Sequence, residues 1–375
     1  MAKRTLALAL ACIGTALPAA ATAIPLPATE SPRAQAACPR AAVAPVIDGR
    51  LDDPAWSFDL DLDVDIQGAE LPGPRFGTQV ATAWDDSFLY IAARLVEPHV
   101  WATCDRRDAV IYHENDFEVF IDPDGDNHLY YELEINALGT VWDLMLIRPY
   151  RDGGPAVDAW DITGLRSAVQ VEGTLNDPTD RDTGWTVELA FPWTVLAQAA
   201  GRRTPPEPGD IWRVNFSRVQ WRTRDQDGRY VKIEDPATGR PLPEDNWVWS
   251  PQGLIAMHYP ERWGELVFLG AGQPARGAFA GNTEHDAIVL ADSLMPVYYR
   301  QREFHEAHGR YAADGAELGL PAGHLPRRDP GLTLPLGADH TLDINGGVDW
   351  FEARLTTPRL TATIDHEGRL RRMSP

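Results

Sequence analysis

The sequence lacks the short motifs that mark the best-known catalytic centres. It has no Gly-x-Ser-x-Gly segment, no glycine-rich loop of the kind that cradles phosphates, and no His-Glu-x-x-His helix. These motifs place a serine nucleophile, a nucleotide phosphate or a zinc ion, respectively. The segment His305-Glu306-Ala307-His308 has the wrong spacing for such a zinc helix. None of these three kinds of catalytic site is therefore indicated.

Positive charge is also scarce. The chain has 34 Lys and Arg residues against 55 Asp and Glu residues, which gives a formal net charge of −21. Binding to nucleic-acid backbones and to anionic membranes depends on basic residues that neutralise phosphates. We therefore expect no nucleic-acid partner.

The sequence has no apolar run long enough to predict a membrane span. Near the N-terminus, Lys3 and Arg4 precede the uncharged segment Thr5–Leu17, and Ala21-Thr22-Ala23 follows. A transmembrane helix needs about 20 apolar residues. A short basic segment, an apolar run and a small-x-small site together predict a signal peptide over residues 1–23. We expect an exported protein, periplasmic or extracellular, without a membrane span.

Cysteine is rare, with three residues in the whole chain. Removal of residues 1–23 would leave Cys38 and Cys104. In an oxidising compartment these two could form a disulfide that stabilises the fold by about 4 kcal/mol. Two free thiols are the alternative, and the sequence does not decide between them.

Short segments with period-two alternation dominate the chain after an Ala- and Pro-rich stretch, residues 24–45, which is typical of a linker. Turn residues separate these segments, and no helical pattern lies between them. This predicts an all-β domain over residues 46–270, an antiparallel β-sandwich of the jelly-roll or immunoglobulin-like kind. The clearest predicted strands are Thr78–Trp84, Phe88–Leu95, Asp116–Ile121, Tyr130–Ala137, Val141–Ile147, Gly184–Phe191, Ile211–Trp221 and Gly264–Leu269.

Residues 271–375 have a different pattern. Apolar residues recur at helical spacing between Glu284 and His308, and Gly309 follows as a C-cap. Short β-prone segments come next, such as Thr341–Ile344 and Trp350–Leu355. We expect a small α+β appendage, a helix plus a small sheet, of unknown role.

Tryptophan is concentrated in the predicted sandwich. Twelve of the 13 tryptophans lie between Trp56 and Trp263. Most of them suit a β-sandwich core, but flat aromatic rings also stack on the faces of sugar rings. Trp101, Trp247 and Trp249 lie in polar or Pro-containing segments and are the tryptophans that we expect to contact a ligand.

The segment from Tyr112 to Asp122 is the most informative part of the sequence. In a strand, Asp116 and Glu118 would share one face with Phe120. Carboxylates accept hydrogen bonds from vicinal hydroxyls, and amide or guanidinium groups complete the pattern. Further candidate ligand contacts are Tyr112, Asn136 and Arg218. Three alternatives stay open: a carboxylate pair for glycoside hydrolysis, carboxylates that are plain calcium ligands or solvated surface, and an internal ion pair between Arg218 and Asp116 or Glu118.

The next residues are Asp122-Pro123-Asp124-Gly125-Asp126. Alternate aspartates around a glycine supply oxygen ligands of the kind that calcium needs. The spacing is not that of an EF-hand loop. Asp122, Asp124 and Asp126 are therefore candidate calcium ligands, and an ordinary acidic turn is the alternative.

The order of several short blocks resembles the family 9 carbohydrate-binding modules over residues 38–270. The blocks are Pro45-Val46-Ile47-Asp48-Gly49 with Trp56, Ala83-Trp84-Asp85, Leu89-Tyr90-Ile91, Glu118-Val119-Phe120-Ile121-Asp122, Gly184-Trp185-Thr186-Val187-Glu188 with Pro192-Trp193, Gly209-Asp210 with Arg213-Val214-Asn215-Phe216-Ser217-Arg218, Trp249-Ser250-Pro251-Gln252-Gly253 and Pro260-Glu261-Arg262-Trp263-Gly264.

The resemblance implies a β-sandwich that binds glucans, xylans or their sugar ends, often with structural calcium. By position, Tyr112 corresponds to the first of two sugar-clamping rings and Glu118 to a polar contact. Two positions depart from the family pattern, because Met257 lies near the place of the second ring and Glu134 replaces a basic contact. Only the neighbourhood of Asp122 matches the family's calcium residues.

The prediction from sequence is thus a non-catalytic carbohydrate-binding protein linked to carbohydrate catabolism, with a polysaccharide or oligosaccharide such as xylan or glucan as its ligand. The alternatives are a glycoside hydrolase of the endoxylanase kind, an envelope protein-interaction module, and a sandwich that binds haem or another cofactor. No cofactor other than structural calcium is expected.

Overall fold

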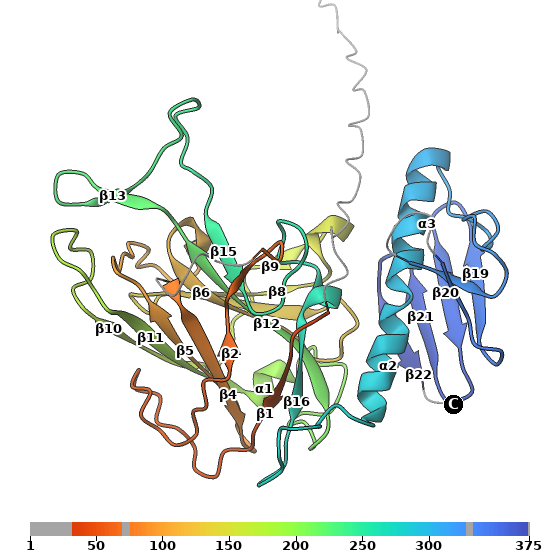
Figure 1. The fold of residues 1–375 in the computed structure, drawn as a ribbon, viewed down its shortest axis with the longest axis horizontal. Coiled ribbons are helices and arrows are strands. Elements are labelled where there is room, and N and C mark those ends of the chain that lie inside the picture. The colour runs from red at the N-terminus through yellow and green to blue at the C-terminus, as the bar shows by residue number, and fades with distance from the viewer. Residues whose placement is uncertain (1–31, 70–75, 328–332, 374–375) are drawn as a thin grey trace, which may run out of the picture.

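Two β-sheets packed face to face form the main part of the protein (Figure 1). The computed structural model describes residues 32–69, 76–327 and 333–373. The larger sheet has the strand order β1-β16-β12-β6-β7-β8-β9, in which β15 also pairs with β12 and β3 pairs with β15. The smaller sheet has the order β10-β11-β5-β4-β2. The strands pair antiparallel except for β1 and β16, which are parallel. The predicted all-β sandwich is therefore confirmed.

The strands of the larger sheet are β1 (Gln35–Cys38), β3 (Val64–Asp65), β6 (Asp116–Asp122), β7 (Tyr130–Asn136), β8 (Val141–Leu146), β9 (Ala156–Val157), β12 (Ile211–Gln220), β15 (Asp245–Val248) and β16 (Gly264–Phe268). Those of the smaller sheet are β2 (Leu60–Asp61), β4 (Thr78–Trp84), β5 (Phe88–Val96), β10 (Arg166–Glu172) and β11 (Gly184–Pro192). A separate hairpin consists of β13 (Thr223–Asp225) and β14 (Tyr230–Lys232), and the short helical turns are η2 (Ile111–His113), η3 (Tyr150–Asp152), α1 (Trp193–Leu196) and η4 (Pro260–Arg262).

The core fills the space between the two sheets. Alternate residues of β6, namely Phe117, Val119 and Ile121, belong to this core, because successive side chains of a strand point to opposite faces. Trp84 and Trp212 each lie edge-on to Phe268, with ring centroids 5.7 and 5.3 Å apart. The other residues of β6 consequently point to the outer face of the larger sheet.

The N-terminal segment requires a correction. Residues 24–45 were predicted to be a linker, but Gln35–Cys38 forms β1, whose backbone pairs with Glu265–Phe268 of β16. The small side chains of Ala36 and Ala37 give little periodic signal, so backbone pairing alone identifies this edge strand. The predicted signal peptide, residues 1–23, lies outside the described residues.

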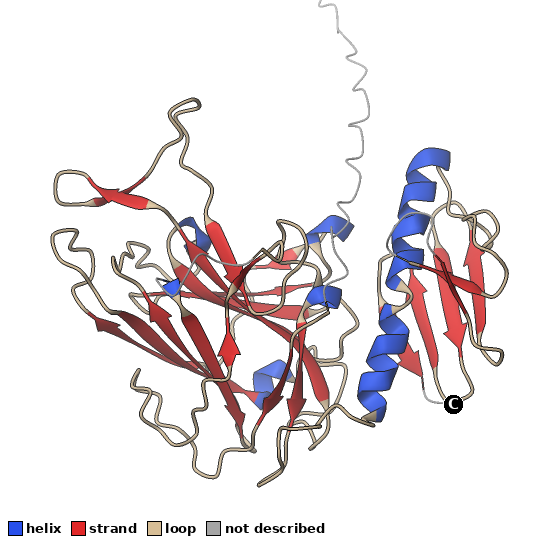
Figure 2. Ribbon diagram, in the orientation of Figure 1, coloured by secondary structure: helices blue, strands red, loops and turns tan. Residues whose placement is uncertain are grey.

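The C-terminal part pairs two helices with a small sheet (Figure 2). The helices are α2 (Thr283–Asp292) and α3 (Met295–His308), and β19 (Thr341–Gly346), β20 (Phe351–Thr356), β21 (Thr361–Asp365) and β22 (Leu370–Met373) form a four-stranded antiparallel sheet. A two-stranded ribbon of β17 (His324–Pro326) and β18 (Thr333–Pro335) completes it. We expected one helix from Glu284 to His308. Instead α3 starts anew with a proline in its first turn, where the missing N–H costs no helical hydrogen bond.

The C-terminal part and the sandwich share a hydrophobic cluster. Leu254 and Tyr259, from the loop between β15 and β16, pack with residues of α2, α3 and the four-stranded sheet. Arg213 and Arg33 both form ion pairs with Asp292 of α2. None of the helices that the structure describes is both long and apolar enough to cross a bilayer.

Candidate functional site

Four carboxylates gather on the outer face of the larger sheet. Asp116 and Glu118 project from β6, and Glu132 and Glu134 project from the neighbouring strand β7. Glu118 lies opposite Glu134 in the strand register, so period-two alternation brings all four side chains to one face. They are between 0% and 5% exposed. One carboxylate oxygen from each of Asp116, Glu118 and Glu134 lies within 4.8 Å of the others.

Burial and mutual repulsion raise the pKa values of these carboxyl groups. The pKa values of Asp116, Glu132 and Glu134 lie well above the ordinary values, first because burial disfavours the charged form and second because neighbouring carboxylates repel. Burial raises the pKa of Glu118 to about 7, although the Ser217 hydroxyl counteracts part of this shift. Glu118 is therefore partly protonated at neutral pH, and a protonated carboxyl group donates as well as accepts hydrogen bonds.

Aromatic rings lie around the carboxylates. Tyr112 of η2 is 39% exposed, and its ring is nearly parallel to that of Trp142, with centroids 6.3 Å apart. Trp142 lies beside Glu134 in the register of β8. Tyr150 is 50% exposed and packs edge-on against His258 at 4.5 Å. The pKa of Tyr112 is raised by burial and by Glu134, and that of Tyr150 is raised to about 12 by burial and by Glu132, which places both phenol groups within electrostatic range of the carboxylates.

Two backbone contacts fix the position of Tyr112. Its N–H donates to Oε2 of Glu134 at 2.9 Å, and its carbonyl accepts from Nε1 of Trp221 at 2.9 Å. Trp221 in turn lies under Lys232, whose Nζ is 3.1 Å from the ring centroid. The site therefore combines buried carboxylates with exposed rings in fixed positions, a surface suited to a ligand with both hydroxyls and an apolar face.

The structure brings together three of the predicted ligand contacts, Tyr112, Asp116 and Glu118. Trp101 is partly exposed on another loop. The N–H groups of its sequence neighbours Val100 and Ala102 donate to the side chains of Asp182 and Asn176, respectively. Within the described part of the chain, no contact joins Trp101 to the four carboxylates. Its predicted ligand contact stays a prediction.

Trp247 and Trp249 are buried, which corrects their assignment to a ligand surface. Trp249 is 9% exposed and belongs to the main core. A Cβ atom added at Gly264 would lie 2.2 Å from Cζ3 of Trp249, so the ring fits against a position that only glycine leaves open. Trp247 is 5% exposed and packs on Phe76, with ring centroids 5.0 Å apart.

Arg218 and Asn136 also have structural partners in place of a ligand. The three guanidinium nitrogens of Arg218 donate to the side chains of Glu97, Gln220 and Thr78 and to the carbonyl of Phe76. These five hydrogen bonds use every N–H of the group. Arg218 therefore forms an internal ion pair, as one of the alternatives from the sequence predicted, but its partner is Glu97 and not Asp116 or Glu118.

Asn136 is 0% exposed. Its amide nitrogen donates to Glu114 and to the carbonyl of Cys104, and its amide oxygen accepts from the N–H groups of Leu138 and Thr140. These bonds fix the turn after β7, so they leave Asn136 no group for a sugar.

Cys38 and Cys104 are free thiols, so the disulfide alternative is wrong. Cys38 ends β1, where it lies opposite Phe268 in the strand register and is fully buried in the core. Cys104 lies beside Glu114, and burial and this carboxylate raise its pKa to about 11. The two thiols contact different parts of the sandwich.

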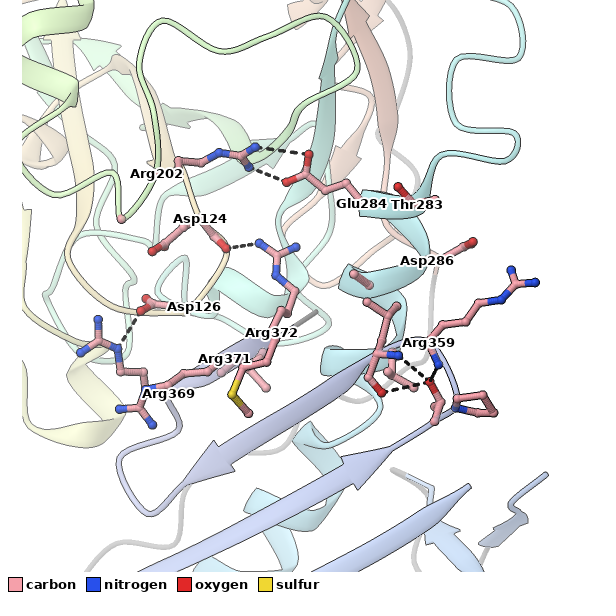
Figure 3. Close-up of a pocket in the computed structure, with 18 of the residues that line it drawn as sticks. Asp124, Asp126, Arg202, Thr283, Glu284, Asp286, Arg359, Arg369, Arg371 and Arg372 are labelled. Atoms are coloured by element: carbon pink, nitrogen blue, oxygen red, sulfur yellow. Dashed lines mark hydrogen bonds and ion pairs between the residues drawn. The ribbon is translucent and has the colours of Figure 1, made fainter. Parts of the chain in front are cut away.

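The predicted calcium loop connects β6 to β7 and faces the C-terminal sheet (Figure 3). One oxygen from each of Asp122, Asp124 and Asp126 lies within 4.8 Å of the others. Burial and Asp126 raise the pKa of Asp124 to about 6, and its buried Oδ1 has no hydrogen-bond partner. An unpartnered oxygen within such a cluster fits a hard cation.

Two arginines of the C-terminal segment already supply positive charge to this loop. Nε of Arg369 lies 2.7 Å from Oδ2 of Asp126, and Arg372 donates to the carbonyl of Asp124. A calcium ion would therefore use oxygens of Asp122 and Asp124 and would compete with Arg369 for Asp126.

A cavity of about 1180 Å³ lies beside this loop, between the sandwich and the C-terminal part (Figure 3). Arginines are prominent in its lining, but ion pairs hold several of them, such as Arg202 with Glu284 and Arg371 with Asp365. Internal ion pairs thus neutralise several of the arginines that line this cavity.

Sequence reasoning missed Glu132, Trp142, Tyr150 and His258. Alternation within Tyr130–Ala137 would have placed Glu132 and Glu134 on one face, and a hairpin pairing with β6 would have placed that face beside Glu118. Tyr150 and His258 come from loops, where no periodic pattern predicts position.

Comparison with known proteins agrees with the fold. Residues 47–206 match the family model described as carbohydrate family 9 binding domain-like. An endo-1,4-β-xylanase A from Thermoanaerobacterium saccharolyticum is 25% identical over 162 residues, which is 42% of this chain and 12% of that protein. The exoglucanase XynX from Acetivibrio thermocellus is 26% identical over 158 residues, again 42% of this chain and 12% of that protein.

Among solved structures, a family 9 carbohydrate-binding module from Caldicellulosiruptor kristjanssonii in complex with cellotriose is similar, with a TM-score of 0.41 and 16% identity over 65% of this chain and 96% of that one. The matched segment of this chain covers only a small part of each curated relative. The match to the family model lies within the sandwich, from the segment before β2 to the loop between α1 and β12. Residues 47–206 therefore belong to the carbohydrate family 9 binding domain-like family.

Proposed function

We propose that this protein binds carbohydrate without cleaving it, on the outer face of the larger sheet. The observation that carries this proposal is the pair of exposed tyrosines, Tyr112 and Tyr150, beside buried carboxylates in a family 9 sandwich. A pyranose ring has an apolar C–H face and an edge of hydroxyls. Tyrosine rings stack on the C–H face, and carboxyl groups form hydrogen bonds with the hydroxyls.

The sugar specificity belongs to the same proposal. The curated relatives are named as a xylanase and an exoglucanase, and the solved module holds cellotriose. We propose xylan or glucan oligosaccharides as the first ligands to test and carbohydrate catabolism as the process served.

Titration calorimetry with cello- and xylo-oligosaccharides tests the binding proposal. Tyr112→Ala removes a stacking ring and should weaken binding about five- to tenfold, since one aromatic contact contributes about 1–1.5 kcal/mol. Trp350→Ala is the matched control, because Trp350 is 51% exposed in the C-terminal part. Equal affinities for the wild-type protein and Tyr112→Ala would refute this location of the site.

Glycoside hydrolysis is the second candidate function. Glu118, with a pKa of about 7 beside other carboxylates, has the property of a general acid. Release of reducing sugar from xylan or cellulose, abolished by Glu118→Gln, would favour hydrolysis. Binding without any release of reducing sugar would support the non-catalytic function.

We further propose export to the periplasm or the extracellular space. The pattern of residues 1–23 supports this proposal. Mass spectrometry of the protein from its native host should find a mature N-terminus after Ala23, and an intact N-terminus on the cytoplasmic protein would contradict it.

A further inference from the structure

The outer-face site differs from the rest of the protein in its balance of charge. Other buried carboxylates have strong donors. Glu97 pairs with Arg218, Glu261 with Arg151, and Glu265 with Arg33. Glu188 accepts from the N–H groups of Asp48 and Gly49 and from Nε1 of Trp56. Cations or several N–H groups therefore compensate the negative charge of these four carboxylates.

The four site carboxylates have much weaker compensation. Asp116 accepts one backbone N–H, at 3.3 Å, and Glu134 accepts one, at 2.9 Å. Oδ2 of Asp116 and Oε2 of Glu118 are buried without a hydrogen-bond partner. No lysine or arginine in residues 32–69, 76–327 and 333–373 forms an ion pair with any of the four.

The nearby groups that could carry positive charge do not supply it. Nε2 of His258 lies 3.9 Å from Oε2 of Glu132, but burial lowers the pKa of His258 to about 3, so the ring is neutral. Arg218 interacts electrostatically with Asp116, but all its N–H groups donate elsewhere. Buried carboxylates without a partner are costly, and a bound cation would relieve that cost.

The aromatic rings independently favour a cation. The faces of Tyr and Trp rings attract ammonium and guanidinium groups. The ring of Tyr112 stacks on Trp142, which lies beside Glu134 in the strand register. Tyr150 packs on His258, which lies next to Glu132. The combination of aromatic faces with unpaired carboxylates is the arrangement that holds an organic ammonium group.

We infer that this site takes a positively charged group, and that on the proposed sugar-binding surface this group is the ammonium of an amino sugar. The inference rests on the proposed function and adds the class of ligand. The ammonium would donate to the unpartnered oxygens of Asp116 and Glu118, while the pyranose face stacks on Tyr112. A metal ion is the other source of positive charge, and the experiment separates the two.

The experiment is calorimetry of the full mature chain at pH 7 with EDTA. The probes are β-1,4-linked glucosamine oligomers, their N-acetylated counterparts and neutral β-1,4-linked glucose oligomers of equal length. We expect the glucosamine oligomer to bind at least tenfold more tightly than the other two. Glu134→Gln should reduce this preference to about twofold. Glu172→Gln, on the exposed edge strand of the other sheet, should keep the preference.

The outcomes separate the inference from the function on which it rests. If neutral oligomers bind, Tyr112→Ala weakens them, and glucosamine has no advantage, the amino-sugar inference is overturned and the proposed function stands. If neutral sugars bind only with added Ca²⁺ or Mn²⁺ and Glu134→Gln removes that requirement, the cation is a metal ion and the ammonium assignment is overturned. If no sugar binds, the proposed function itself is overturned. Thermal melts of each variant establish that it is folded.

Discussion

At the scale of single residues, Arg218 illustrates how a buried charge acts in this sandwich. Its guanidinium lies between the sheets, 2.6 Å from Glu97, and over the ring of Trp247 at 5.2 Å. Replacement of one member of such a pair leaves the other charge buried and unpaired, which is more harmful than the loss of the attraction itself.

Arg218→Ala should therefore reduce the free energy of unfolding by about 3–5 kcal/mol. The double replacement Arg218→Met with Glu97→Met should cost clearly less, because it leaves no unpaired charge. Urea denaturation of the three proteins measures both values. A double variant as unstable as Arg218→Ala would contradict this account of the pair.

The carboxylates of the site predict a pH dependence of stability. Glu118 has a pKa of about 7 in the folded state against an ordinary value of 4.5, and Asp116, Glu132, Glu134 and Glu244 face it. The folded state thus binds more protons than the unfolded state, so stability falls as pH rises from about 4.5 through 7. Thermal melts between pH 5 and pH 8 should show a higher melting temperature at pH 5.

Glu118→Gln removes one titrating group and should flatten part of that slope, mainly between pH 5 and pH 7. Because the glutamine side chain has nearly the same shape as that of glutamate, the variant should pack like the wild-type protein. An unchanged slope in the variant would show that other groups control the pH dependence.

Sequence patterns predicted some site residues but not others for a physical reason. Asp116 and Glu118 follow from strict alternation within one strand. Trp247 and Trp249 lie in a segment of mixed polarity, and their burial depends on Gly264 and Phe76, which are distant in sequence. Contacts of that kind have no local signature.

At the scale of elements, strands that alternate strictly were predicted nearly to the residue. The segment Thr78–Trp84 coincides with β4, and Gly184–Phe191 ends one residue before β11 does. The edge strand β10 alternates only weakly and has exposed residues on both faces, so its pairing with β11 defines it more than its sequence does. Short strands such as β2 and β3 depend on their neighbours in the same way.

The loop between β6 and β7, together with β22, allows a test of the predicted calcium site. Calcium at a hundredfold excess over its Kd would add about 2.7 kcal/mol of stability, or roughly 5 °C in melting temperature. We expect the wild-type protein in calcium to have this higher melting temperature relative to a sample in EGTA. Asp124→Asn should abolish the increase, whereas the control Asp235→Asn, which changes an exposed turn, should keep it. Arg369→Ala should strengthen the calcium effect because it frees Oδ2 of Asp126. Identical melts of the wild-type protein in calcium and in EGTA would exclude the site.

At the scale of the whole molecule, the boundary near residue 270 separates two patterns of sequence, but the C-terminal hydrophobic cluster extends across it. The sequence predicted an appendage because a β pattern gives way to a helical one. The loop residues Leu254 and Tyr259 nevertheless lie in the C-terminal cluster. Tyr298 and Tyr299 of α3 bond to Asp152 and Glu261 of the sandwich. A pattern of secondary structure cannot reveal such contacts, because they join residues far apart in the chain.

These contacts predict that the two parts unfold together. Arg151 is buried against Glu261 and lies over the ring of Tyr259, 4.4 Å from its centroid, and the helices cover this cluster. Scanning calorimetry of the full chain should therefore give one cooperative transition, with a calorimetric enthalpy equal to the van't Hoff enthalpy. A chain that ends at residue 270 would expose Leu254 and Tyr259 and would leave Arg213 without Asp292. We expect a loss of roughly 2–4 kcal/mol of stability, which lowers the melting temperature by about 5–10 °C. Two separate transitions in the full chain, or an unchanged melting temperature after truncation, would instead make residues 271–375 an independent domain.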